Sequence, residues 1–339
     1  MENSKIEIIA ECAQSYEGKI TIAKKLLIAA INGKADAVKF QLVYADELST
    51  ADYIHYSFFK KIEMDFAKWK NIVNICKQKK IKFYLDIFGE KSLSIAQKLK
   101  VNGIKIHPTD LDNYKLLKKV KKSNIQKIYL GIGGASTTEI NNALKILKNK
   151  KLILLLGFQS YPTPNNLNQI SRINHLKILL SKKFKKIKIK FGFADHSINM
   201  DSSIACSVAA IGAGANIIEK HITIKSKKPL EDSESAIIDK DFLILKKILL
   251  LAWEATNFLP MKKASFGMSN IEKKYKMSVR RVFVSNKKLN KRYNFKNIAD
   301  LDLKRSSLKG TIYNFKNIKN KQLIIIIPQN TPITKKIIK

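Results

Sequence analysis

Two histidines in this sequence come directly after predicted strands. His196 follows the run Lys190–Ala194 and His221 follows Asn216–Glu219, and both runs have the composition of short strands. The segment between them, Asp201–Ala213, has apolar residues at helical spacing. A strand–helix–strand unit makes its two strands parallel neighbours, so we expect the two imidazoles at the carboxyl ends of adjacent strands.

Imidazoles and carboxylates are common ligands of divalent metals. Asp195 and Glu219 lie beside the two histidines in the sequence. A single histidine at a strand end is more often a hydrogen-bonded residue that binds nothing. Two histidines at matching positions of one strand–helix–strand unit favour a metal site instead, with His196 and His221 as its ligands.

Strand and helix signals alternate from Ile6 to Trp253. Further strands are predicted at Ile6–Ala10, Ala35–Leu42, Ile81–Ile87, Gly103–Ile106, Lys127–Leu130 and Leu152–Leu156. Helices are predicted at Lys19–Asn32, Phe66–Lys79, Lys91–Lys100, from Asp110, from a capping box of Ser136 and Glu139, at Asn165–Leu180 and at Phe242–Trp253. This alternation predicts a closed (β/α)8 TIM barrel over residues 1–257. The alternative is an open doubly wound sheet, although no GxGxxG motif follows the first strand.

In such a barrel, the polar residues that follow each strand gather at one mouth. They are Glu11, Lys39, Gln41, Asp86, Lys105, His107, Asp110, Gly131, Gln159, Tyr161, Asp195, His196, Glu219 and His221. Lys39 lies between Val38 and Phe40 on a predicted buried strand, which favours a place in the mouth over a solvated surface position. So many carboxylates, lysines and histidines at strand ends predict an active site there.

The character of the chain changes after residue 257. Residues 258–274 lack periodicity and read as a linker. Residues 275–339 contain short strand-like runs separated by Asn, Lys and Gly turns, which predicts a small β-rich domain. We expect Leu323–Ile327, an LIIII run, to be a buried strand of this domain.

Composition narrows the class of protein. The chain has 339 residues, 45% of them hydrophobic, and a formal net charge of +37. The lysines are spread along polar helix faces, and no zinc-finger spacing, RNP-like motif or basic-aromatic patch is present, so we expect no nucleic-acid partner. Cys12, Cys76 and Cys206 match no CxxC pattern, the N-terminus is too polar for a signal peptide, and no apolar run could span a membrane. These features predict a cytoplasmic protein. An anionic small-molecule substrate would gain from the positive charge of the chain.

Several motifs resemble those of the sialic acid synthase family, whose members make N-acetylneuraminate, legionaminate or pseudaminate. The matching stretches are IIAE at Ile8–Glu11, ADAVKFQ at Ala35–Gln41, KI at Lys105–Ile106, SYPTP at Ser160–Pro164, DHS at Asp195–Ser197, IEKHIT at Ile218–Thr223 and KR at Lys304–Arg305. The resemblance spans nearly the whole chain and implies that the C-terminal domain is an antifreeze-like (SAF) domain.

The resemblance implies a reaction and a set of roles. Phosphoenolpyruvate would condense with the open-chain aldehyde of an N-acetyl hexosamine and release phosphate. His196 and His221 would hold a divalent metal, manganese first and magnesium or cobalt as alternatives. Lys39 and Lys105 would hold phosphoenolpyruvate. Glu11, Asp110, Glu219 and Asp232 would contact the sugar or handle protons. Gln41, Gln159 and Tyr161 would help to place the substrates. Arg305 would reach the active site of the partner subunit in a domain-swapped homodimer.

The chain departs from the family pattern at positions expected to surround phosphoenolpyruvate, the donor substrate. The usual KIGSGE reads KIHPTD, with Pro108 for a serine and Asp110 for a glutamate. Other hydroxyl or amide residues are replaced by Asp86, Gly131, Gln159 and Ala194. Thr109 and His107 could supply a hydrogen-bond donor in place of the missing residues. Three readings follow: a synthase with a rearranged phosphoenolpyruvate pocket, a related C–C bond synthase or lyase with another 2-keto donor, and a sugar-binding homologue without catalysis.

Overall fold

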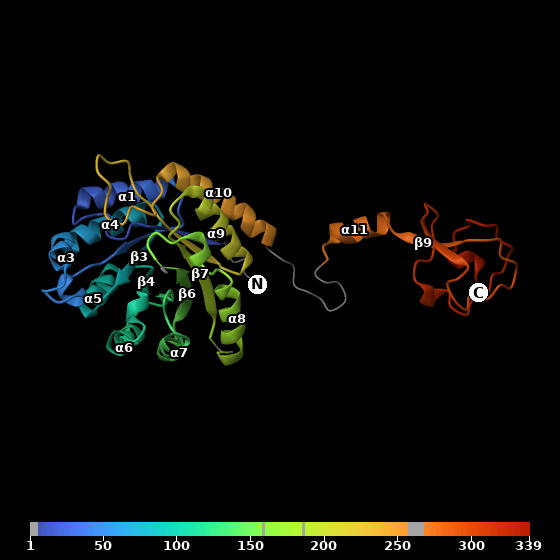
Figure 1. The fold of residues 1–339 in the computed structure, drawn as a ribbon, viewed down its shortest axis with the longest axis horizontal. Helices are drawn as coiled ribbons and strands as arrows, with labels where there is room; N and C mark the ends of the chain where they lie inside the picture. The colour runs from blue at the N-terminus through green and yellow to red at the C-terminus, as the bar shows by residue number, and fades with distance from the viewer. Residues whose placement is uncertain (1–5, 158–159, 185–186, 257–267) are drawn as a thin grey trace. The chain divides into compact units, whose positions relative to one another are not determined.

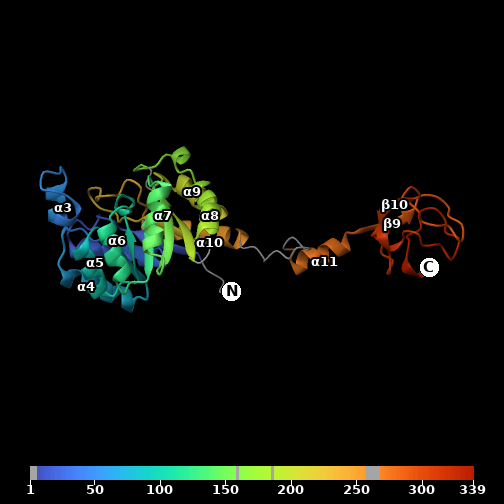
Figure 2. The same cartoon turned by 90° about the horizontal axis from the view of Figure 1, so that it is seen from below.

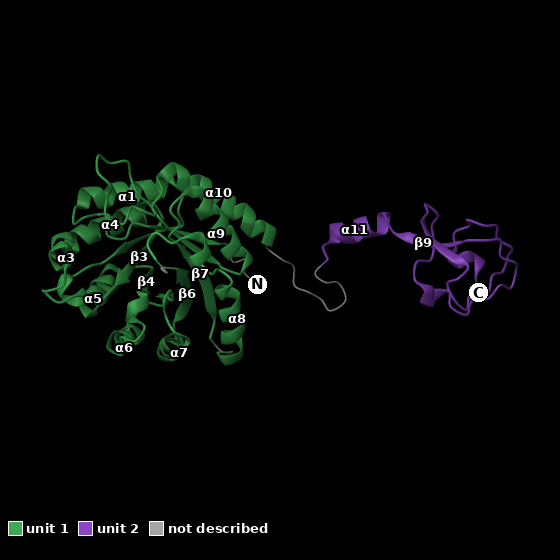
Figure 3. Cartoon of the chain, viewed as in Figure 1, with its two compact units in different colours: residues 1–257 green, residues 258–339 purple. Residues whose placement is uncertain are grey.

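The computed structural model describes residues 6–157, 160–184, 187–256 and 268–339. The chain divides into two compact units, Met1–Asn257 and Phe258–Lys339 (Figure 3). In the first unit, strands β1 to β8 are parallel, pair in sequence order and close into a barrel, with helices around the outside (Figures 1 and 2). The predicted TIM barrel is confirmed, and the open sheet is excluded.

The order of elements follows the alternation of the sequence. The strands are β1 (Glu7–Glu11), β2 (Ala37–Gln41), β3 (Lys82–Ile87), β4 (Gly103–Ile106), β5 (Lys127–Gly131), β6 (Lys151–Gly157), β7 (Ile189–Asp195) and β8 (Ile217–His221). The helices are α1 (Ile20–Asn32), α2 (Ala45–Leu48), α3 (Tyr56–Ile62), α4 (Phe66–Gln78), α5 (Glu90–Leu99), α6 (Tyr114–Lys122), α7 (Thr137–Ile146), α8 (Arg172–Lys183), α9 (Met200–Gly212) and α10 (Asp239–Thr256). Short 3₁₀ turns cover Pro108–Asp110 and Asn165–Leu167.

Each strand buries both of its faces, because successive side chains point alternately into the barrel and toward the helices. The outward residues, such as Phe40 and Leu154, pack with the helices in the main core. The inward residues form a separate apolar cluster of Ile9, Ala37, Tyr84, Tyr129, Ile153, Leu155, Ala194 and Ile217. This apolar layer separates two groups of charged side chains inside the barrel.

The lower charged group lies at the amino ends of the strands and centres on Glu7. Its carboxylate accepts hydrogen bonds from Tyr84 at 2.7 Å and Tyr129 at 2.8 Å, and pairs with Lys82 and Lys127. Burial alone would raise the pKa of Glu7, but the lysines and the Tyr84 hydroxyl lower it to about 2. This end of a TIM barrel contributes stability, whereas activity lies at the other end.

Most helix boundaries match the sequence prediction. The capping box at the start of α7 is present, with Ser136 and Glu139 bonded reciprocally. The helix predicted over Asn165–Leu180 begins instead at Arg172, because a 3₁₀ turn and an irregular stretch precede it. None of the helices in the described ranges is long and apolar enough to cross a membrane.

The second unit contains helix α11 (Asn270–Ser278) and a two-stranded antiparallel sheet of β9 (Arg281–Ser285) and β10 (Leu301–Arg305). Its core includes Phe295, Leu323, Ile327 and Ile333. The expectation of a buried strand at Leu323–Ile327 was wrong. Only its two ends are buried and paired by isolated bridges, whereas the three central isoleucines are exposed by 38 to 57%.

Candidate active site

The upper charged group, at the carboxyl ends of the strands, contains two lysines and three carboxylates. They are Lys39, Lys105, Glu11, Asp86 and Glu219. Lys39 on β2 contacts Glu11 on β1, lies 2.6 Å from Asp86 on β3, and lies 3.5 Å from Glu219 on β8. Lys105 on β4 lies 2.7 Å from Glu219 and 3.5 Å from Asp86. The strand register explains the cluster, because all five residues point inward at the carboxyl ends of neighbouring strands.

Nearly complete burial makes the charges of this cluster depend on one another. Burial, together with the charges of Asp86 and Glu219, raises the pKa of Glu11 to about 8. Burial would also raise the pKa of Glu219, but Lys105 and Lys39 outweigh it and hold that pKa below its usual value. The three carboxylates hold the pKa of Lys39 well above its usual value, against the effect of burial. Burial and the neighbouring carboxylates therefore favour the protonated form of Glu11, whereas the lysines favour the ionised form of Glu219.

The two predicted metal ligands lie side by side above this cluster. The ring centroids of His196 and His221 are 5.2 Å apart, and the Tyr161 ring is 5.5 Å from the first and 5.4 Å from the second. Burial, then the charge of Lys105, lowers the pKa of His196 to about 4. Burial and His196 lower the pKa of His221 well below its usual value. Both imidazoles are therefore neutral, the form that binds a metal.

These residues fit a metal ion only in part. Within the described residues, no group of three or more His, Cys, Asp or Glu side chains could hold a metal by itself. Asp195 does not join the histidines, because it pairs with Lys220 at 3.1 Å and accepts the Ser197 amide at 2.9 Å. Two neutral imidazoles facing a cavity suit a metal whose remaining ligands come from substrate and water.

A second polar group links the end of β2 to the loops after β1, β6 and β8. Gln14 donates its side-chain amide to Gln41 at 2.8 Å and its backbone N–H to Asp232 at 3.2 Å. The Tyr161 hydroxyl donates to the Asp232 carbonyl at 2.6 Å. Burial raises the pKa of the Asp232 carboxyl to about 6. Gln14 is a residue that sequence reasoning missed, since a glutamine in a loop carries no pattern.

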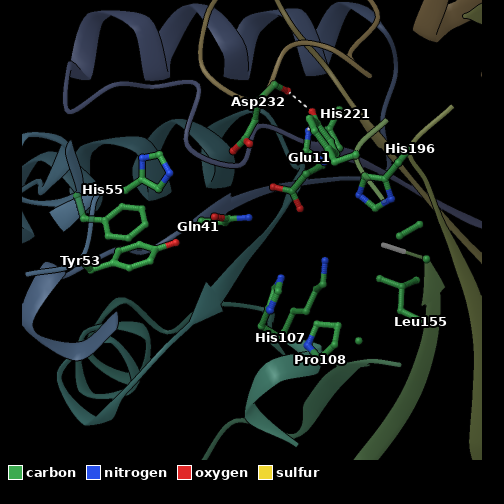
Figure 4. A pocket seen from close by; sticks show the side chains of 16 residues that line it. Glu11, Gln41, Tyr53, His55, His107, Pro108, Leu155, His196, His221 and Asp232 are labelled. Carbon is green, nitrogen blue, oxygen red and sulfur yellow. Dashed lines mark hydrogen bonds between the residues drawn. The ribbon is translucent and has the colours of Figure 1, made fainter. Parts of the chain in front are cut away.

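One cavity of about 420 Å³ joins these groups, and Glu11, Lys105, His196, His221 and Asp232 are among the residues that line it (Figure 4). One wall is apolar and is made of Pro108, Gly131, Leu155, Gly157 and Ala194. A Cβ at position 131 would lie 2.6 Å from Cδ of Pro108, so the proline excludes a hydroxyl side chain at Gly131. The wall therefore offers no hydroxyl group to an anion. His107, Tyr53, His55 and Phe59 complete the lining on other sides.

Two of the predicted site residues on the barrel belong neither to the cavity lining nor to the charged cluster, and two more cannot be placed against the cavity. Asp110 accepts a hydrogen bond from Asn113 at 2.9 Å, and Thr109 contacts His107 at 3.0 Å; neither is among the residues that line the cavity. Arg305 belongs to the second unit, where it lines a different cavity with Arg280. Gln159 falls outside the described residues.

The chain is similar to several known proteins. Residues 26–256 match the family model described as the NeuB family. The chain is 30% identical over 233 residues to the uncharacterized protein MJ1065 of Methanocaldococcus jannaschii, a match that covers 68% of this chain and 65% of the relative. It is 29% identical over 257 residues to the N,N'-diacetyllegionaminic acid synthase of Campylobacter jejuni, covering 70% of this chain and 73% of that enzyme. The solved N-acetylneuraminic acid synthetase of Leptospira borgpetersenii superimposes with a TM-score of 0.70 at 26% identity, over 82% of this chain and 93% of that one.

Proposed function

The chain belongs to the NeuB family, and on that premise we propose that it is a sialic-acid-type (nonulosonate) synthase. It joins a three-carbon 2-keto acid unit from phosphoenolpyruvate to the aldehyde carbon of an open-chain N-acetyl hexosamine. One observation carries this proposal: His196, His221, Lys105 and Glu11 line one cavity at the carboxyl ends of the strands. The buried side chains of Lys39, Asp86 and Glu219 form ion pairs with Glu11 or Lys105.

The reaction balances with water as the third reactant. The enol carbon of the donor attacks the aldehyde carbon, water adds at C2, and phosphate leaves with cleavage of the C–O bond. A divalent metal held by His196 and His221, manganese first, would supply Lewis-acid polarisation of the aldehyde oxygen. Burial raises the pKa of Glu11 and favours its protonated form, which is suited to give a proton to that oxygen as it becomes a hydroxyl.

The remaining residues bind and orient the two substrates. Lys105 lines the cavity and would contact the donor anion, with Lys39 behind it. Gln41, Asp232 and Tyr161 would accept from and donate to the sugar hydroxyls and the amide, because their polar groups face the same cavity. We extend the proposal to the second unit as an SAF domain and to a domain-swapped homodimer, which light scattering of the full chain would test.

A second candidate function is favoured by Asp86. Both lysines that would hold phosphoenolpyruvate are already paired with carboxylates, and the adjoining wall lacks hydroxyl groups. Such a pocket suits a donor with less negative charge, such as pyruvate. In that reaction a C3 proton of pyruvate is removed, C3 bonds to the aldehyde carbon, and a proton returns to the new hydroxyl without release of phosphate.

One experiment distinguishes the two. The full chain is incubated with Mn²⁺ and a panel of N-acetyl hexosamines, with phosphoenolpyruvate in one arm and pyruvate in the other, and products are identified by mass spectrometry. Equimolar phosphate and a 2-keto acid in the first arm support the nonulosonate synthase. A product only in the pyruvate arm supports the second candidate, and no product in either arm at high protein concentration rejects both.

A further inference from the structure

A buried ion pair lies directly beside both histidines in the chain. Asp195 precedes His196 and Lys220 precedes His221. The two residues are partners in the register of β7 and β8, and their charged groups lie 3.1 Å apart. Both side chains are completely buried. Neither is among the residues that line the cavity, so any effect on a molecule bound there passes through other residues.

Lys220 also binds the residue that follows His196. Its ammonium group donates to the backbone carbonyl of Ser197 at 2.8 Å. The Asp195 carboxylate accepts the backbone N–H of Ser197 at 2.9 Å. Lys220 therefore contacts the residues on both sides of His196 and is itself the residue before His221. This one side chain couples the backbone of the first histidine to the backbone of the second.

The main chain of His196 is held from two further directions. Its carbonyl accepts the Ser235 hydroxyl at 2.8 Å and the backbone N–H of Thr163 at 2.9 Å. The two donors come from the loops after β8 and β6, and each of these loops also carries a residue of the cavity lining. The place of the His196 ring is therefore set by main-chain contacts from three segments, one of which is β8 with Lys220.

Stability alone does not explain an ion pair at this position. The loss of hydration offsets much of the attraction between two buried charges, and apolar side chains of similar size are often as stabilising. Apolar contacts have no fixed direction, whereas an ammonium group donates hydrogen bonds and a carboxylate accepts them in defined directions. The pair is better explained by the geometry that it imposes on the ends of β7 and β8.

Metal binding depends on such geometry. The ring centroids of His196 and His221 are 5.2 Å apart, and both rings face the cavity (Figure 4). An imidazole nitrogen binds a divalent ion such as zinc at about 2 Å, so two rings share one ion only when their nitrogens converge. A shift of one strand end relative to the other would remove a ligand.

We propose that Lys220 and Asp195 are positioning residues that hold His196 and His221 together as ligands of one divalent metal. The inference rests on the proposed function for the presence of that metal. Loss of the pair should weaken Mn²⁺ binding by about tenfold to a hundredfold, the usual effect of residues that orient metal ligands. The rate at low Mn²⁺ should fall in parallel and recover at saturating Mn²⁺, because both histidines remain.

Two variants of the full chain separate positioning from stability. Lys220→Met leaves the Asp195 carboxylate buried without its partner and should lower the midpoint of thermal unfolding by about 10 °C. Lys220→Met combined with Asp195→Asn removes both charges and keeps an acceptor for the Ser197 amide. Its midpoint should lie within about 4 °C of wild type. Electron paramagnetic resonance should nevertheless show a Kd for Mn²⁺ at least about tenfold higher in both variants.

A second ion pair of the barrel unit supplies the control. Lys246 on α10 pairs at 2.8 Å with Asp36, the residue before β2, at the end of the barrel opposite the cavity. Lys246 is also buried, with 9% of its surface exposed. Lys246→Met should lower the midpoint of thermal unfolding and leave the Kd for Mn²⁺ unchanged.

The outcomes distinguish this inference from the proposed function. Wild-type Mn²⁺ affinity in the double variant overturns the inference. An equal loss of affinity in Lys246→Met also overturns it, because general destabilisation would then be the cause. Absence of Mn²⁺ binding by the wild-type chain overturns it as well. Weaker Mn²⁺ binding in the double variant, without product from any donor and acceptor, supports the inference and rejects only the proposed reaction. If Lys220→Met alone does not fold, the double variant decides.

Discussion

The ammonium group of Lys39 lies 2.6 Å from the carboxylate of Asp86, on the adjacent strand of the barrel. Both side chains are completely buried. The same carboxylate lies 3.5 Å from Lys105. A single aspartate therefore offsets the charge of both lysines that are expected to receive the donor.

Replacing this aspartate should change the choice of donor. Asp86→Thr removes a negative charge from the cluster and restores a hydroxyl, so we expect the KM for phosphoenolpyruvate to fall about tenfold. The measurement is initial-rate kinetics with phosphoenolpyruvate and, separately, with pyruvate. Asp201→Thr, at an exposed position in the first turn of α9, is the matched control. An unchanged KM for phosphoenolpyruvate would contradict the charge argument.

Removing either predicted metal ligand should abolish activity and metal binding together. His196→Ala or His221→Ala should lower kcat by about a thousandfold or more if the metal polarises the aldehyde. Electron paramagnetic resonance should show weaker Mn²⁺ binding in both variants. His175→Ala, on the exposed face of α8, should behave as wild type. Full Mn²⁺ affinity in either active-site variant would rule out that histidine as a ligand.

The carboxyl group of Asp232 should make acceptor binding depend on pH in the range just below neutrality. Its pKa is raised to about 6 by burial, so the carboxylate takes up a proton as pH falls through that value. We expect kcat/KM for the acceptor to decline below about pH 6, because a protonated carboxyl no longer accepts from a sugar hydroxyl. In Asp232→Asn this acid limb should disappear and kcat/KM should be low throughout.

The same substitution should stabilise the barrel. A raised carboxyl pKa means that the folded state disfavours the charged form, so the free energy of unfolding rises as pH falls from about 6 toward 4. Asp232→Asn should therefore gain about 1–2 kcal/mol at pH 8 and nothing near pH 3.5. Urea unfolding followed by fluorescence measures this, since Trp69 and Trp253, the two tryptophans of the chain, lie in the barrel unit. A loss of stability at pH 8 would contradict the predicted sign.

Glu7 should contribute to stability with the opposite pH dependence. Its pKa is lowered to about 2, so its contribution is present above its ordinary pKa of 4.5 and is lost as pH falls toward 2. Burial also lowers the pKa of its partner Lys127, which reduces the net benefit of the pair. We expect Glu7→Gln to lose about 2 kcal/mol at pH 7, and the difference from wild type to shrink by more than half by about pH 3. If the difference in the free energy of unfolding stayed constant across that pH range, the charge of Glu7 would not be the cause of the stabilisation.

The barrel could be predicted from sequence because its signals are local. Apolar runs such as Leu152–Leu156 must be strands buried on both faces, and the Ser136 capping box marks a helix start. Strand ends in a TIM barrel meet at one mouth, so the prediction that Glu11, Lys39 and Glu219 come together follows from fold and position alone.

Features that depend on register and loop geometry could not be predicted. The pairing of Lys39 with Asp86 requires a known register between β2 and β3, which no local pattern gives. Asp110 follows β4 as an active-site residue would, yet a 3₁₀ turn begun by Pro108 leaves it bonded to Asn113 outside the cavity lining. The LIIII run at Leu323–Ile327 has strand composition, but among the described residues only isolated bridges pair with its two ends.

The apolar layer inside the barrel has a consequence for how this enzyme can change. Ile153, Leu155 and their neighbours lie between the Glu7 group, which contributes to stability, and the Lys39 group, which under the proposed function meets the substrates. Charges in the upper group can be exchanged without disturbing the lower one, since distant sites with no shared partners contribute independently to stability. Positions 39, 86 and 105 are therefore a self-contained module in which new donor chemistries can be selected on an unaltered scaffold.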